Sequence, residues 1–274
     1  MEWAVGAVVG SAVGDALGAP FEFGPQGAFS ARFPGPGVGG EMCGGGGWAA
    51  GEPKDIGLQT EDVLTNGMPW DLAAAVHFQI NQRAAGNGSL MRAATSAVYF
   101  ARAGRSATMD AARRIAALTH GDRAAWEGTA VFHELIRVTL AGADPLDALP
   151  DVLDLVHPDH RRRYATVLAT DWHPDQATEF NGAVWPCLGS AVWALRSTTS
   201  FEDAMRAAID VGGDTDTVAA VTGGLAGAYH GMGAILTRWT EPLHVPLPGF
   251  DGRVLRRTDL VDLAHRLDSE IALD

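Results

Sequence analysis

The residues best suited to chemistry are concentrated between Gly212 and Thr217. This segment reads Gly-Gly-Asp-Thr-Asp-Thr, so the carboxylates of Asp214 and Asp216 alternate with two hydroxyls, and an apolar segment follows directly. Oxygen-only clusters of this kind suit a hard divalent cation such as Mg²⁺ or Mn²⁺. Residues two apart in a helix point about 200° away from each other, so these carboxylates can share an ion only from the loop and first turn where a helix begins. A helix N-cap followed by a first-turn acid would give the same pattern without a metal.

A second candidate lies at residues 86–92, which read Gly-Asn-Gly-Ser-Leu-Met-Arg before the apolar segment Ala93 to Phe100. The first backbone N–H groups of a helix are unpaired and carry partial positive charge, so such a start can receive a phosphate or pyrophosphate without a lysine. Ordinary turn and N-cap chemistry uses the same residue types. The segment alone therefore leaves both interpretations open.

Two helices are expected to position these groups, and both carry glycine at four-residue intervals. Gly6, Gly10, Gly14 and Gly18 line one face of an N-terminal helix, while Gly223, Gly227 and Gly231 line one face of the helix after the Asp-rich segment. Each glycine destabilises an isolated helix by up to ~1 kcal/mol relative to alanine. We therefore expect the glycines to serve another purpose, the close approach of a neighbouring backbone. The spacing predicts that these helices form the centre of the domain. They run antiparallel if Asp15 lies beside Asp214 and Asp216.

Most of the remaining chain has apolar residues three and four apart, which predicts helices. No segment shows a convincing alternation of apolar and polar residues, so no strand is predicted. Residues 20–52 read as a long loop rich in Pro and Gly. We therefore expect an all-α fold, a single-domain orthogonal helical bundle spanning residues 1–274. The further predicted helices are 69–83, 89–103, 106–119, 123–141, 145–156, 183–197, 201–211 and 258–270.

Composition narrows the function classes. The net charge of −13 argues against a nucleic-acid partner, and the run Arg161-Arg162-Arg163 is expected to be a solvated turn or helix face. The only cysteines, Cys43 and Cys187, are far apart, so no disulfide framework is indicated and a cytoplasmic location is the default. The apolar N-terminus lacks a basic start, and no uninterrupted apolar run is long enough to span a bilayer, so a soluble chain is expected. Oligomeric state is left open.

These motifs together resemble the ADP-ribosylglycohydrolase family. Residues 10–23, from Gly10 to Phe23, are similar to its opening helix and the acidic loop that follows. Residues 53–57 (Pro-Lys-Asp-Ile-Gly) and 86–92 are similar to its middle motifs, residues 118–120 (Leu-Thr-His) to its Thr-His segment, and residues 212–217 to its C-terminal metal motif. The matches occur in order across most of the chain. The resemblance implies an all-α domain that binds ADP-ribose next to Mg²⁺ or Mn²⁺.

The resemblance also implies roles for particular residues and an activity, the removal of ADP-ribose from a modified protein side chain such as arginine or serine. Carboxylates hold one or two ions, the ions grip the ribose hydroxyls, and an oxocarbenium-like centre is attacked by water. The implied metal ligands are Asp214, Asp216 and Thr217, with Glu22 and Asp216 catalytic. The implied ADP-ribose contacts are Asp15, which also supports the metal or its waters, together with Gly86, Asn87, Gly88, Ser89, Leu90, Met91 and His120.

One departure from the family pattern affects the expected metal site. The family's first metal motif, Thr-Asp-Asp-Thr, normally precedes the Pro-Lys-Asp-Ile-Gly motif, but here Gly51-Glu52 runs directly into Pro53. Thr60-Glu61-Asp62 resembles that motif superficially, but it follows the Pro-Lys-Asp-Ile-Gly motif, where the family continues with an ordinary helix, so a solvated helix face is the preferred interpretation. Trp48 is either an aromatic lid or an incidental surface residue. The alternative to an active hydrolase is an impaired ADP-ribose-binding or structural relative that has lost half of the metal site.

Overall fold

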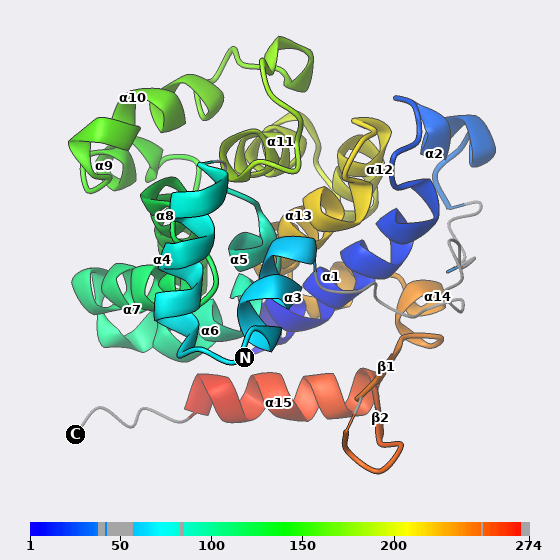
Figure 1. Ribbon diagram of the computed structural model, residues 1–274. Coiled ribbons are helices and arrows are strands. Elements are labelled where there is room, and N and C mark those ends of the chain that lie inside the picture. Colours follow the sequence, from blue (N-terminus) through cyan, green and yellow to red (C-terminus); the bar gives the residue numbers. More distant parts are fainter. Residues whose placement is uncertain (38–41, 43–56, 83–84, 248, 270–274) are drawn as a thin grey trace.

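The computed structural model describes residues 1–37, 42, 57–82, 85–247 and 249–269, and these form an almost entirely helical protein (Figure 1). Its centre is the pair α1 (Glu2–Gly18) and α13 (Thr215–His230), which pack along their whole lengths. Helices α11 (Val184–Ser197) and α12 (Phe201–Asp210) pack against α13. The long α8 (Arg123–Leu140) also contacts the pair. The expected all-α class is confirmed.

The remaining elements surround this centre or extend from it. They are the 3-10 helices η1 (Ala19–Phe21), η2 (Ala101–Ala103), η3 (Pro174–Gln176) and η4 (Met232–Ala234), the helices α2 (Ala28–Arg32), α3 (Leu58–Thr65), α4 (Trp70–Asn81), α5 (Gly88–Met91), α6 (Ala93–Phe100), α7 (Arg105–Ala117), α9 (Leu149–Leu153), α10 (Pro158–Val167), α14 (Thr237–Thr240) and α15 (Arg257–Ser269), and the strands β1 (His244–Pro246) and β2 (Val254–Arg256).

The glycine pattern produces the predicted close approach of α1 and α13. A Cβ placed on Gly10 would lie 2.3 Å from the carbonyl oxygen of Gly223, and one placed on Gly223 would lie 2.1 Å from that of Gly10. Gly6 faces Gly227 in the same way. Because residues early in α1 face residues late in α13, the helices run antiparallel, as predicted. Backbone therefore packs on backbone where side chains would normally separate two helices.

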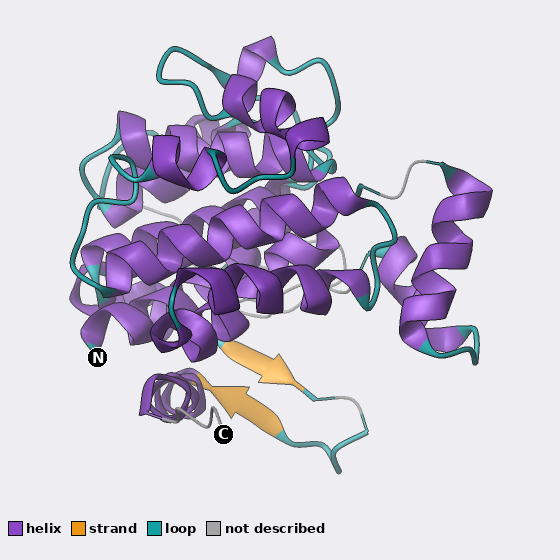
Figure 2. Ribbon diagram, turned by 90° about the vertical axis from the view of Figure 1, so that its left-hand side faces the viewer, coloured by secondary structure: helices purple, strands orange, loops and turns teal. Residues whose placement is uncertain are grey.

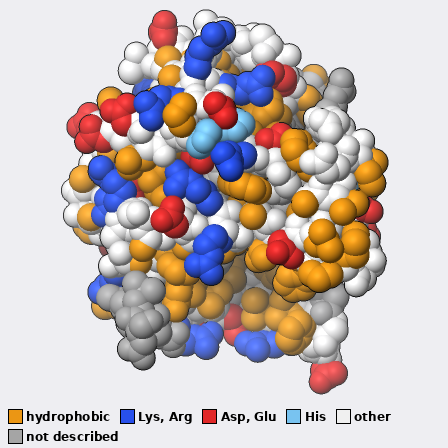
Figure 3. Space-filling model, turned by 60° about the vertical axis from the view of Figure 1, so that its left-hand side comes forward, with side chains coloured by type: hydrophobic (Ala, Val, Ile, Leu, Met, Phe, Trp, Pro, Cys, Tyr) orange, Lys and Arg blue, Asp and Glu red, His pale blue; other side chains and the backbone are white. Residues whose placement is uncertain are grey.

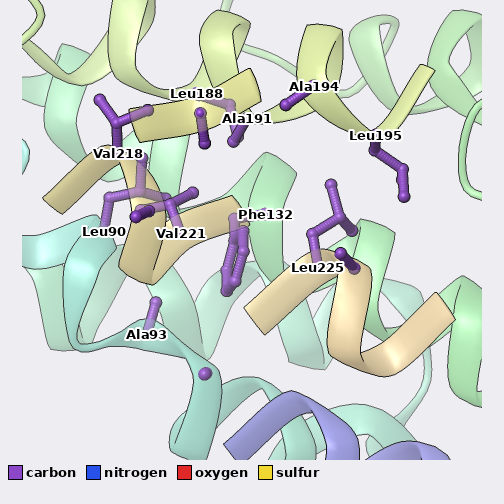
Figure 4. Close-up of a cluster of buried hydrophobic side chains, with 14 of the residues drawn as sticks. Leu90, Ala93, Phe132, Leu188, Ala191, Ala194, Leu195, Val218, Val221 and Leu225 are labelled. Atoms are coloured by element: carbon purple, nitrogen blue, oxygen red, sulfur yellow. The ribbon is translucent and has the colours of Figure 1, made fainter. Parts of the chain in front are cut away.

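The main core fills the space between this pair and its neighbours. Figure 4 shows Leu90 of α5 beside Val218 and Val221 of α13, with Phe132 of α8 and Leu188 of α11 in the same cluster. All five side chains are at most 1% exposed. Because buried side chains in such a core are closely packed, they fix the relative positions of the helices that carry the candidate site.

Several elements differ from the sequence-based expectations. The predicted helix 89–103 is divided at Arg92 into α5 and α6, and the predicted helix 145–156 is reduced to α9. The region expected to be a loop contains η1 and α2. Helices α3 and α10 lie where the sequence indicated only a solvated helix face or turn, and α14 was not predicted.

The expectation of no strand was wrong at one place. β1 and β2 form a two-stranded antiparallel hairpin in which Val245 pairs with Leu255, and this hairpin leads into α15 (Figure 2). Figure 2 also shows α3 and α4 projecting from the body as a pair. Three-residue strands are too short to show the alternation by which a strand is recognised in sequence.

Two other sequence features, the arginine run and the apolar N-terminus, can be placed in the fold. Arg161, Arg162 and Arg163 lie on α10, and the last two are exposed, as expected for a solvated helix face. On the face shown in Figure 3, basic, acidic and hydrophobic side chains are interspersed. Within the described residues one helical stretch, Glu2–Phe21, is long and apolar enough to cross a membrane, and 83% of its apolar window is buried inside the protein, as in a core helix.

Candidate functional site

Three carboxylates meet where the N-terminal end of α13 lies beside the C-terminal end of α1. Glu22, Asp214 and Asp216 each offer an oxygen, and these oxygens all lie within 4.8 Å of one another. Glu22 follows η1, Asp214 is the N-cap residue of α13, and Asp216 lies in its first turn. The structure therefore brings the predicted metal carboxylates together with the predicted catalytic Glu22. All the donors are oxygens, as hard divalent cations prefer.

The turn that presents Asp214 depends on backbone geometry available to glycine. Gly213 has a φ of +73°, and a Cβ there would lie 2.5 Å from Oδ1 of Asn181, so this position excludes any larger residue. Among the described residues, the Asp214 side chain forms no capping hydrogen bond to α13. The capping interpretation of Asp214 is therefore not supported, and its carboxylate is directed to other partners.

Two asparagines fix the position of Asp214. Asn181 Oδ1 accepts a hydrogen bond from the Asp214 N–H at 2.9 Å, and its Nδ2 donates to the carbonyl of Gly212 at 2.8 Å. Asn87 Nδ2 donates to Asp214 Oδ2 at 2.9 Å and to the carbonyl of Asn181 at 3.0 Å. Asn87 was predicted as a ligand contact, whereas Asn181 was not predicted. An isolated asparagine in a Phe-Asn-Gly turn has no feature in sequence that marks it as part of a site.

Asp216 is the buried member of the cluster. It is 4% exposed, and burial raises the pKa of its carboxyl well above the usual range, reinforced by a hydrogen bond and charge repulsion from Asp214 and by the charge of Asp15. Its Oδ1 is buried and has no hydrogen-bond partner among the described residues. A buried, unpaired carboxylate oxygen is costly. A cation among these oxygens would supply the absent partner, so the cluster fits a metal.

Asp15 and Thr217 lie near the cluster, in different surroundings. Asp15 is a buried residue of α1, 7% exposed, and its charge acts on Asp216. The Thr217 hydroxyl donates to Sδ of Met91 at 3.8 Å. Thr215, which was not predicted as a site residue, donates to the carbonyl of Gly18 at 2.8 Å and so ties the start of α13 to the end of α1.

The segment from Gly86 to Met91 adjoins the cluster, mainly through its backbone and Asn87. Gly86 forms an isolated antiparallel bridge with Ala183. Ser89 shares a hydrogen bond with Thr129 at 3.1 Å, and the Leu90 side chain lies wholly in the core. The side chain of Leu90, predicted to contact ADP-ribose, is thus unavailable to a ligand because it packs against α13.

The His120 ring packs against Gly86 and Gly88 of this segment. A Cβ on Gly88 would lie 3.4 Å from its Nε2, while its Nδ1 shares a hydrogen bond with the Thr119 hydroxyl at 2.8 Å. Arg92 donates to the same hydroxyl at 2.6 Å. Burial first, and then the charges of Arg92 and His77, lower the pKa of His120 to about 3. His120 is therefore a neutral imidazole at pH 7, beside the predicted ligand segment.

The other sequence features of the site are divided between described and undescribed residues. Thr60, Glu61 and Asp62 lie in α3, where Thr60 is buried and the other two are exposed. Asp62 is not part of the carboxylate cluster, and its Oδ2 shares a hydrogen bond with Nδ1 of His77 at 2.7 Å. Trp48 and residues 53–56 of the Pro-Lys-Asp-Ile-Gly motif lie outside the described residues.

Comparisons with known proteins agree with this geometry. The family model for ADP-ribosylglycohydrolase matches residues 40–273. The ADP-ribosylarginine hydrolase Tri1 of Pseudomonas putida (strain GB-1) is 29% identical over 191 residues, which cover 68% of this chain and 49% of that protein. The ADP-ribosylarginine hydrolase Tri1 of Serratia proteamaculans (strain 568) is 41% identical over 63 residues, covering 23% of this chain and 17% of that protein. The matches thus span at most about half the length of these relatives.

A solved structure supports the same assignment over nearly the whole chain. A structure described as an ADP-ribosylglycohydrolase-related protein complex is 32% identical, has a TM-score of 0.74, and matches over 97% of each chain. The helical fold, the clustered carboxylates and the family model therefore agree. This chain belongs to the ADP-ribosylglycohydrolase family.

Proposed function

We propose that this protein is a divalent-cation-dependent hydrolase that releases ADP-ribose from a modified protein side chain. The observation that carries the proposal is the cluster of Glu22, Asp214 and Asp216 in a chain of this family, with a buried Asp216 Oδ1 that has no hydrogen-bond partner in the described part of the chain. The cation is Mg²⁺ or Mn²⁺, because the donor set consists of carboxylates with no nitrogen or sulfur ligand among them.

Asp214 and Asp216 would hold the cation, with Thr217 beside them. Bound there, it would supply Lewis-acid stabilisation of the ribose oxygens. Asn87 and Asn181 keep Asp214 in place, since each hydrogen-bonds to it. Partners of this kind commonly tune metal affinity as strongly as some ligands do. Asp15 adds negative charge behind Asp216 and so favours a cation there.

Glu22 is the residue we assign to proton transfer at the scissile bond. It lies at the edge of the cluster and is partly exposed, while Asp216 is buried. A carboxyl at this position can hold a proton near the departing side chain or accept one from an attacking water. The backbone of residues 86–89 and the neutral His120 would contact the ADP-ribose.

An arginine linkage is the first substrate to test. The two curated relatives carry the name ADP-ribosylarginine hydrolase. The chain itself has a net charge of −13, which favours approach of a positively charged protein segment. A serine linkage is the second, because the carboxylate cluster itself does not distinguish the leaving atom.

The test is release of ADP-ribose from arginine-linked and serine-linked peptides with Mg²⁺ or Mn²⁺, and again with a chelator. Asp216→Asn should abolish the metal-dependent release and weaken Mn²⁺ binding, measured by calorimetry, by at least about tenfold. The substitution is isosteric with a protonated Asp216, so the fold should persist. Asp151→Asn, on the exposed face of α9, is the matched control.

Two results would contradict the proposal. Release that persists in the chelator would separate the activity from the cation. A folded protein that binds ADP-ribose but releases it from neither peptide would instead be the impaired relative that the departure in the first metal motif allows.

A further inference from the structure

Two exposed phenylalanine rings stand directly beside the carboxylate cluster. Phe23 is 74% exposed and Phe180 is 57% exposed, and each adjoins a site residue in sequence, Glu22 and Asn181 respectively. The ring centroids lie 6.4 Å apart, and the planes are within 20° of parallel. Residues 23 and 180 come from distant parts of the chain, so the fold itself assembles this aromatic pair at the edge of the site.

The backbone holds both rings in place. Phe23 has a φ of +59°, a conformation that is rare for a bulky residue and costs folding free energy, and its N–H donates to the carbonyl of Gly213 at 2.6 Å. Phe180 packs on two glycines, because a Cβ on Gly182 or on Gly213 would lie 3.0 Å from its ring. Backbone strain of this kind is frequent at functional sites, so the conformation of Phe23 is consistent with a role beside the carboxylate cluster.

The surroundings of the two rings favour a cation. The face of a phenyl ring carries partial negative charge and attracts a cation within about 6 Å. The nearby carboxylates of Glu22, Asp214 and Asp216 add to this potential. A flat cation such as a guanidinium also gains from stacking, since it matches the planar surface of the ring.

We propose that Phe23 and Phe180 bind the guanidinium of the ADP-ribosylated arginine, the group that departs in the reaction. This inference rests on the proposed hydrolase function. The rings adjoin Glu22 and Asp214, so they lie at the reacting end of the ligand, whereas the adenine lies beyond the pyrophosphate. The pair thereby selects arginine-linked over serine-linked ADP-ribose, and its residues determine specificity without taking part in the chemistry.

The experiment compares Phe180→Leu and Phe23→Leu with the wild type on arginine-linked and serine-linked peptides. Each variant keeps an apolar side chain but removes the ring. We expect kcat/KM for the arginine-linked peptide to fall about 3- to 30-fold, as loss of a cation–π contact implies. Activity on the serine-linked peptide and the affinity for free ADP-ribose should stay within about twofold. Phe180→Tyr should restore arginine activity, and Phe250→Leu, at an exposed ring near the β-hairpin, is the matched control.

The outcomes separate the two proposals. Equal losses on both peptides, or weaker binding of ADP-ribose, would assign the rings to the ADP-ribose itself and overturn this inference while leaving the hydrolase function intact. Unchanged arginine activity in Phe180→Leu would overturn it as well. If the folded wild type releases ADP-ribose from neither peptide with either cation, the proposed function fails and this inference fails with it.

Discussion

The contact between α1 and α13 predicts that Gly10→Ala destabilises the protein, although alanine is the better helix former. The added Cβ would lie 2.3 Å from the carbonyl oxygen of Gly223, whereas ordinary contacts of a Cβ begin at 3.4 Å. The shortfall is with backbone, which cannot rotate away as the end of a side chain can. The two helices must therefore separate or bend by about 1 Å, and both are packed by the core on their other sides.

The expected magnitude is the balance of two effects. Helix propensity alone favours alanine over glycine by up to about 1 kcal/mol. Overpacking in a well-packed core typically costs about 1–3 kcal/mol, and more where the surroundings resist. We therefore expect a net loss of about 2 kcal/mol in the free energy of unfolding. For a domain of this size, that corresponds to a fall in Tm of roughly 4–8 °C.

Urea denaturation and thermal melting of the isolated protein measure this loss. Gly35→Ala is the control, because its φ is not positive and a Cβ there would meet nothing within 4 Å. Gly227→Ala should behave like Gly10→Ala, since its Cβ would lie 2.0 Å from the carbonyl of Gly6. The double variant should lose less than the sum of the two single losses, because one separation of the helices relieves both contacts. A stabilised or unchanged Gly10→Ala would refute the close-packing argument.

Two further predictions concern the polar interior. Asn181→Ala should weaken Mn²⁺ binding in calorimetry about 10- to 100-fold, because it frees the Asp214 backbone and the Gly212 carbonyl; an unchanged affinity would mean that Asn181 does not support the metal site. Burial lowers the pKa of His133 from 6.5 to about 4, so the unfolded chain binds a proton that the native state rejects, and stability falls as the pH drops below 6.5. His133→Gln should remove about 2 kcal/mol of the stability lost between pH 7 and pH 5, measured by urea denaturation; an unaltered pH dependence, equal to that of the surface control His265→Gln, would contradict this.

The fold was predictable from sequence where the pattern was long and repeated. Two glycine series at four-residue spacing identified the central helices and, with Asp15, their antiparallel arrangement. The apolar periodicity of α8 and α11 extends over several turns and also identified helices. In contrast, α10 is rich in arginine and buries only Tyr164 and Val167, so it has almost no apolar periodicity.

The candidate site was predictable where its residues lie in a local motif. Asp214 and Asp216 are close in sequence, whereas Glu22 joins them through the fold and was identified only by resemblance to the family. Asn181 and Phe180 were missed, because their importance depends on contacts with residues far away along the chain. A sequence motif also gives no direction for a side chain, so the burial of Leu90 became apparent only in the structure.

The central pair also has a consequence for how the protein is made. α1 leaves the ribosome well before its partner α13, because almost all the other helices lie between them in the sequence. Alone, a helix with glycine at every fourth position is weak, and the apolar residues of α1 stay exposed until α13 arrives. Contacts between segments so far apart in the sequence form slowly. Until they form, the exposed apolar residues of α1 promote aggregation. The carboxylate of Glu22 can therefore meet those of Asp214 and Asp216 only late in synthesis, and a chain that stops before α13 would lack the cluster.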